Sequence, residues 1–113
     1  MIDYNNRTFR SVSNSANGEV NSETLFYYQQ RGFHVTAMYR GGNIVDGSLS
    51  ATADEAGNLT MRYQHVNANG QFLTGICYSK PGILPNGKLR LHEKWQWTFG
   101  DYSSGESVIE EIS

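Results

Sequence analysis

The sequence predicts an all-β fold in which eight antiparallel strands form an up-and-down meander that closes into a barrel. Turn residues recur at regular intervals, and most turns contain the glycine or asparagine that a positive φ angle requires. The runs between the turns are rich in β-branched and aromatic residues. No segment keeps the 3.6-residue period of a helix. The candidate turns are Asn17-Gly18, Arg31-Gly32, Gly41-Gly42-Asn43, Ala56-Gly57-Asn58, Asn69-Gly70, Pro85-Asn86-Gly87 and Gly100-Asp101.

Eight strands are predicted between these turns, roughly at residues 6–13, 22–31, 33–40, 44–54, 59–67, 71–80, 88–99 and 105–112. The short connections favour an up-and-down order, and closure removes the two edges that an open sheet leaves exposed. A flat sandwich is the alternative. We expect residues 1–113 to form a single domain, because this length is typical of one domain and no linker or repeat interrupts it.

Side-chain alternation predicts which face of each strand points into the barrel. In the strand at 88–99, Leu89, Leu91, Trp95 and Trp97 share one face with Glu93, and this face should be the inner one. The other predicted inward sets are Phe33, Val35, Ala37 and Tyr39; Leu59, Met61, Tyr63 and His65; and Phe72, Thr74, Ile76 and Tyr78. His34 and His92 fall on outer faces.

Turn positions predict how the strands pair. A turn at Arg31-Gly32 pairs Tyr28 with Val35. By the same turn, Phe26 lies opposite Ala37. A hairpin centred on Ala68-Asn69 places His65 opposite Phe72, which agrees with the inward sets above.

The predicted interior contains aromatic rings together with a few polar groups, as in small barrels that enclose a ligand. Alternatively, the tyrosines lie at the barrel ends with their hydroxyls in water. The candidate ligand-binding residues are Tyr28, Tyr39, Tyr63, His65, Thr74, Tyr78, Glu93, Trp95 and Trp97.

Glu93 is the most informative of these residues, because a carboxylate on an apolar face costs several kcal/mol unless it is paired or protonated. Pairing of Ile76 with Leu91 would place Glu93 beside Thr74, with Tyr63 one strand further. Glu93 is either a ligand-binding or acid–base group, or a member of a structural hydrogen-bond network. We expect its pKa to be raised by desolvation.

Composition excludes several classes of function. The chain has 113 residues, 38% of them apolar and 12% aromatic, a net charge of −2 and no run of basic residues, so nucleic acid is not an expected partner. We recognise no signal peptide and no apolar run of the ~18 residues that span a bilayer, so a cytoplasmic protein without membrane contact is expected. The single cysteine, Cys77, should face outward or an interface and be inert. No histidine pair has the spacing of a metal site, and no metal or cofactor is expected.

This sequence shows two resemblances, and the first covers nearly the whole chain. Residues 83–98, together with Met61-Arg62-Tyr63, Gly75-Ile76-Cys77 and the end at 107–112, resemble a group of small bacterial proteins often labelled N-acetylglutamate synthase. That resemblance implies an acetyltransferase. The Trp95-x-Trp97-Thr98-x-Gly100 pattern resembles the seventh strand of avidin-type barrels, and this resemblance implies a calycin or avidin-like architecture.

Three functions are compatible with these features of the sequence. The first is non-enzymatic binding of a small ligand inside the barrel, which the aromatic interior favours. The second is an acetyltransferase, although Gln29-x-x-Gly32 is followed by His34, which breaks the pattern that grips coenzyme A. The third is a structural or homo-oligomeric interaction module with a filled interior.

Overall fold

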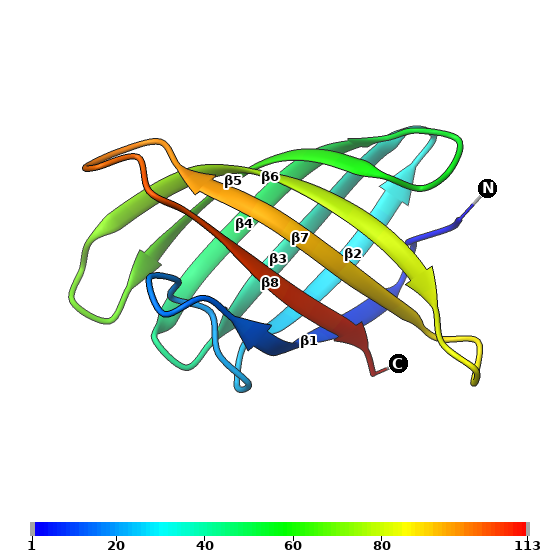
Figure 1. The fold of residues 1–113 in the computed structure, drawn as a ribbon, viewed down its shortest axis with the longest axis horizontal. Helices are drawn as coiled ribbons and strands as arrows, with labels where there is room; N and C mark the ends of the chain where they lie inside the picture. The colour runs from blue at the N-terminus through cyan, green and yellow to red at the C-terminus, as the bar shows by residue number, and fades with distance from the viewer. Residues whose placement is uncertain (1, 113) are drawn as a thin grey trace.

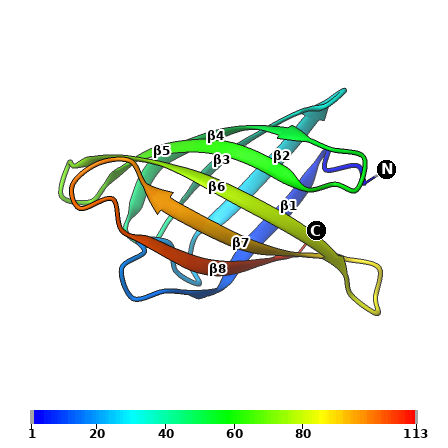
Figure 2. The ribbon, with the colours of Figure 1, turned by 45° about the horizontal axis from the view of Figure 1, so that its top comes forward.

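Residues 2–112 of the computed structural model form eight antiparallel strands, each paired with its neighbours in sequence (Figures 1 and 2). The first and last strands also pair, with Arg10 opposite Glu110, and this contact closes the barrel. The eight-stranded meander predicted from the sequence is therefore confirmed. The strands are β1 (Arg7–Asn14), β2 (Leu25–Arg31), β3 (His34–Gly41), β4 (Ile44–Ala53), β5 (Leu59–Asn67), β6 (Phe72–Ile83), β7 (Leu89–Trp97) and β8 (Ser104–Glu111).

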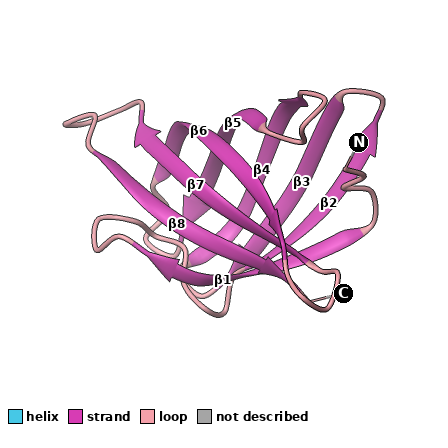
Figure 3. Cartoon of the chain, turned by 45° about the vertical axis from the view of Figure 1, so that its right-hand side comes forward, coloured by secondary structure: helices cyan, strands magenta, loops and turns pink. Residues whose placement is uncertain are grey.

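The up-and-down order separates the connections between the two ends of the barrel. The loops β1–β2, β3–β4, β5–β6 and β7–β8 lie at one end, which we call the loop end (Figures 1 and 3). The three other loops and both chain termini lie at the opposite end, which we call the terminal end. Among the described residues there is no helix long and apolar enough to cross a membrane.

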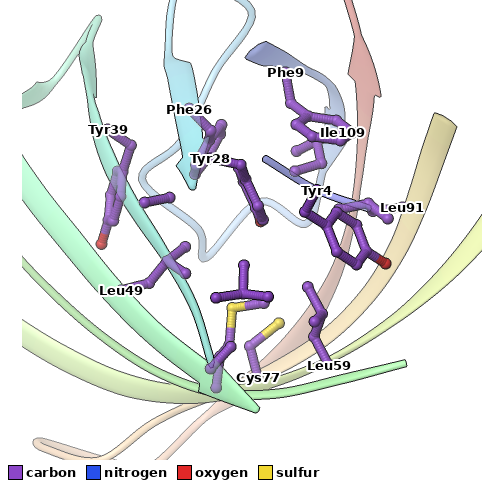
Figure 4. Close-up of a cluster of buried hydrophobic side chains, with 14 of the residues drawn as sticks. Tyr4, Phe9, Phe26, Tyr28, Tyr39, Leu49, Leu59, Cys77, Leu91 and Ile109 are labelled. Carbon is purple, nitrogen blue, oxygen red and sulfur yellow. The ribbon is translucent and has the colours of Figure 1, made fainter. Parts of the chain in front are cut away.

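The terminal end is filled by large side chains. Tyr4, which precedes β1, is fully buried, and its hydroxyl donates a 2.5 Å hydrogen bond to the carbonyl of Gly57. The ring centroid of Tyr28 lies 4.8 Å from that of Phe9 and 5.9 Å from that of Tyr4 (Figure 4). Tyr4 from the segment before β1 therefore closes this end of the barrel together with Phe9 of β1 and Tyr28 of β2.

The predicted inward face of β6 was wrong. Phe72 and Tyr78 are 84% and 59% exposed, and Thr74 also lies on the outer surface. Ile76 is half-buried on the same outer face. The inner face instead carries Leu73, Gly75, Cys77 and Ser79.

The reason for this error is a turn one position longer than predicted. Asn67 N–H donates to Gln71 O across a three-residue loop whose last residue, Gly70, has a φ of 78°. His65 therefore lies opposite Leu73 and not Phe72. A shift of one residue in register moves every side chain of a strand to the other face.

Two other predicted pairings were also displaced. Arg31 pairs with His34, so the β2–β3 turn consists of Gly32 and Phe33, with glycine at the first turn position, where a type II′ hairpin takes it. Phe33 is consequently 59% exposed rather than inward. Tyr28 lies opposite Ala37 and not Val35, while Phe26 lies opposite Tyr39 and not Ala37. Val35, Ala37 and Tyr39 keep their predicted inward face.

In the β6–β7 hairpin the turn lies at Pro85-Asn86-Gly87, closed by Leu84 N–H donating to Lys88 O. This turn pairs Ile76 with Gln96 and not with Leu91. Glu93 is therefore beside Ser79, not beside the predicted Thr74.

Candidate functional site

A cavity of about 60 Å³ lies inside the barrel toward the loop end. Its wall is mainly apolar, with a few polar groups from several strands. The residues that line it are Asn14, Gly18, Glu19, Val20, Phe26, Tyr39, Leu49, Met61, Tyr63, His65, Cys77, Glu93, Trp95, Trp97 and Ser107.

Three of the aromatic rings of this cavity lie over a glycine directly opposite on the neighbouring strand. The pairs are Tyr39 with Gly47, Tyr63 with Gly75, and Trp95 with Gly105. A Cβ atom at any of these glycines would overlap the ring. At Gly47, for example, the Cβ atom would lie only 2.5 Å from Tyr39 Cε2. The glycines therefore provide the space into which the rings fold, as in aromatic–glycine pairs of curved sheets.

The rings form two groups on the cavity wall. On β2 and β3, the centroids of Phe26 and Tyr39 are 5.0 Å apart and the rings are stacked. On β5 and β7, the ring centroid of Trp97 lies 5.3 Å from that of Trp95 and 5.8 Å from that of Tyr63. These contacts fix the ring orientations, so the aromatic wall is already formed in the structure.

Glu93 points into the barrel, as predicted, and is only 9% exposed. Burial raises its pKa from about 4.5 to about 7, and the hydroxyls of Ser107 and Ser79 on the flanking strands lower it in part. Ser107 Oγ donates a 3.1 Å hydrogen bond to Glu93 Oε1. The carboxyl group therefore changes its charge near neutral pH.

His65 is buried, as predicted, and both of its ring nitrogens have protein partners. The Tyr39 hydroxyl lies 2.9 Å from Nδ1, and Glu19 Oε1 lies 2.7 Å from Nε2. These partners fit a neutral ring that donates from Nε2 and accepts at Nδ1. Burial lowers the pKa of His65, and the contact with Glu19 raises it in part. Glu19 Oε2 also accepts a hydrogen bond from the Asn67 amide at 3.0 Å.

Glu19 belongs to the β1–β2 loop (residues 15–24), which folds over the loop end of the barrel. Two further hydrogen bonds hold this loop in place. Asn14 Nδ2 donates to Val20 O at 3.0 Å, and Trp97 Nε1 donates to Asn17 O at 3.2 Å. The loop therefore covers part of the cavity and is attached to side chains of the barrel interior.

The structure divides the nine predicted site residues into three groups. Those that line the cavity are Tyr39, Tyr63, His65, Glu93, Trp95 and Trp97. Tyr28 is fully buried in the packed terminal end. Thr74 and Tyr78 lie on the outer surface, so their predicted inward position was wrong.

Sequence reasoning missed several cavity residues. Cys77 was expected to face outward, but it is 4% exposed, and Figure 4 shows its sulfur turned toward the barrel interior. Burial raises the pKa of its thiol far above the usual range, which fits the expected inertness. Phe26 was paired with inward residues but was not chosen as a site residue. Asn14, Glu19 and Ser107 have no sequence signal, because the pairing of β1 with β8 and the course of the loop bring them to the cavity.

An eight-stranded up-and-down barrel with an aromatic cavity at one end defines a class of small antiparallel barrels that includes the calycins and avidins. A comparison with protein families is more specific: the model of the family described as avidin-like protein matches residues 2–112. The chain therefore belongs to the avidin-like family. Comparisons with curated proteins and with solved structures found no match. None of these findings supports the resemblance to N-acetylglutamate synthase.

Proposed function

We propose that this barrel binds a small organic ligand in the cavity beneath the β1–β2 loop, without chemical conversion. The observation that carries the proposal is the wall itself, in which preformed aromatic groups surround a small number of buried polar groups. Ligand sites in proteins commonly have this composition. Membership of the avidin-like family supports a barrel of this kind.

The polar groups of the cavity favour binding over catalysis. Both nitrogens of His65 are engaged by Tyr39 and Glu19, so neither is free to take a proton from a substrate. The raised pKa of Cys77 keeps its sulfur as a thiol, which is a poor nucleophile. Neither His65 nor Cys77 therefore has an arrangement suited to the alternative acetyltransferase function.

A pair of matched variants tests the proposal. Tyr63 lines the cavity, whereas Tyr78 lies on the outer surface of the next strand and is 59% exposed. Ligands would be found by screening a library of small fragments with ligand-observed NMR. We expect Tyr63→Leu to weaken binding of the hits by about threefold to tenfold, because an aromatic contact contributes about 0.5–1.5 kcal/mol beyond its area. Tyr78→Leu should leave binding unchanged.

Thermal melts and near-UV circular dichroism would show that both variants are folded. Equal weakening in the two variants, or hits that bind only through Tyr78, would place the ligand on the outer surface. A library without any hit in the millimolar range would refute binding in the cavity.

A further inference from the structure

Among the described residues, the cavity wall carries acidic side chains and no lysine or arginine. Glu93 and Glu19 both contribute carboxylates. Glu19 is paired with His65, whose ring is neutral in the hydrogen-bond arrangement described above. The interior therefore offers negative charge without a fixed positive group.

Glu93 has no cationic partner among residues 2–112. The ion pairs found there join Arg7 to Glu111 and Arg90 to Glu110, and the neutral His65 ring contacts Glu19 and not Glu93. Its carboxyl group accepts a hydrogen bond from Ser107 and has the Ser79 hydroxyl beside it, and both of these groups are neutral, although more than nine-tenths of the Glu93 surface is buried. A buried carboxylate without a counter-charge is costly, and a cation in the adjacent cavity would remove much of that cost.

The rest of the wall also suits a cation that carries N–H groups. Faces of Trp, Tyr and Phe rings attract cations, and five such rings line the cavity. Asn14 Nδ2 donates to Val20 O, and this bond fixes the amide so that Oδ1 is its remaining acceptor. Asn14 lines the cavity, and its Oδ1 is buried and has no hydrogen-bond partner among the described residues.

The size of the cavity limits the ligand. A water molecule needs about 10–15 Å³ of space measured in this way, so about 60 Å³ holds roughly four to six non-hydrogen atoms. We propose that the cavity selects a small organic ammonium ion of about this size, with its charge held by Glu93 and its apolar body against the aromatic rings. This inference rests on the proposed function, because it names the class of ligand for the same cavity.

Two probes of nearly equal shape test the charge preference. tert-Butylammonium and tert-butanol differ in one group, and only the first is a cation. We expect tert-butylammonium to bind at least about tenfold more tightly at pH 8 in a ligand-observed NMR titration, which corresponds to about 1.4 kcal/mol. Glu93→Gln should remove this preference. Glu106→Gln, which removes an exposed carboxylate from β8, should keep it.

The pH dependence gives an independent readout on the unmodified protein. Binding of the cation should tighten as the pH rises from 6 to 8, because Glu93 loses its proton in this range, whereas binding of the alcohol should not. Burial keeps the neighbouring Tyr and Cys groups neutral here, and Glu19 and His65 pair with each other. The other titratable groups of the barrel interior and the loop that covers it are Tyr4, Tyr28, Tyr39, Tyr63, Cys77, His65 and Glu19.

The outcomes separate this inference from the proposed function. Binding of tert-butanol with equal or greater affinity would overturn the cation preference and leave a ligand cavity in place. Retained preference in Glu93→Gln would also overturn it, and the pH profile decides the matter if that variant does not fold. Failure of both probes at millimolar concentration, together with an empty fragment screen, would refute both proposals.

Discussion

The burial of Glu93 should make the stability of this protein fall as the pH rises toward neutrality. Its pKa is raised from about 4.5 to about 7, so the folded state holds the proton more tightly than the unfolded chain. The stabilising contribution is therefore complete below pH 4.5 and is lost as the pH rises through 7. The difference between the two values corresponds to about 3 kcal/mol.

Glu93→Gln removes this dependence while keeping the shape of the side chain. We expect the variant to be more stable than the original protein by up to about 3 kcal/mol at pH 8, with the gap closing toward pH 4.5. For a chain of this length, that difference shifts Tm by roughly 10 °C. Urea denaturation followed by the fluorescence of Trp95 and Trp97 at several pH values would measure it.

The comparison between the two proteins isolates Glu93 from other titrating groups. The lowered pKa of His65 acts with the opposite sign, because the unfolded chain takes up its proton first as the pH falls. This contribution is common to both proteins and cancels in the difference. Glu106→Gln serves as the exposed control. Parallel stability curves for the original protein and Glu93→Gln would refute the assignment of a buried, proton-binding carboxyl group.

Four further outcomes are expected. Gly105→Ala should destabilise the fold by about 1–3 kcal/mol and change tryptophan fluorescence, because the new methyl group overlaps the Trp95 ring. Gly82→Ala is the control: the nearest atom to its new methyl group is 3.9 Å away, so stability and fluorescence should hardly change. Glu19→Gln should weaken the attachment of the β1–β2 loop and increase amide hydrogen exchange at residues 15–24, without a similar increase in the strands. Cys77 should resist alkylation in the folded protein and react after denaturation. Incubation with acetyl-coenzyme A and glutamate should release no coenzyme A; release that Glu93→Gln abolishes would contradict the binding role proposed for the cavity.

The strand pattern was predictable because turn chemistry is local. The predicted strand at 59–67 coincides with β5, and the remaining strands agree within a few residues. Glycine at Gly32 and Gly87 takes the positive φ angles that reverse the chain, and a single sequence displays such positions directly. The number and order of strands follow from these positions.

The inner face of β6 was not predictable from hydrophobicity in that strand alone. Its inward residues include Gly75, Cys77 and Ser79, which are smaller and less apolar than the outward Phe72 and Tyr78. Space over Gly75 is filled by the ring of Tyr63 from β5. Side chains of neighbouring strands share one interior, so a strand beside large rings needs small residues on its inner face.

The same argument explains which part of the site could be anticipated. The orientation of Glu93 follows from its own strand, because Leu91 and Trp95 on either side fix the inner face. Its partners depend instead on register between strands, and a displaced pairing with β6 replaced the expected Thr74 by Ser79.

The position of Glu93 is better explained by a ligand than by stability. The free energy of unfolding of a domain of this size is only about 5–15 kcal/mol. At a pH above the pKa of Glu93, its buried charge lowers this free energy by about 3 kcal/mol, which is a large part of the total. The hydroxyls of Ser107 and Ser79 lower the pKa only in part and do not keep it at its ordinary value. A leucine at this place would avoid the cost within the otherwise apolar inner face of β7. The carboxyl group lines a preformed aromatic cavity, where a bound cation would convert this local cost into affinity and selectivity.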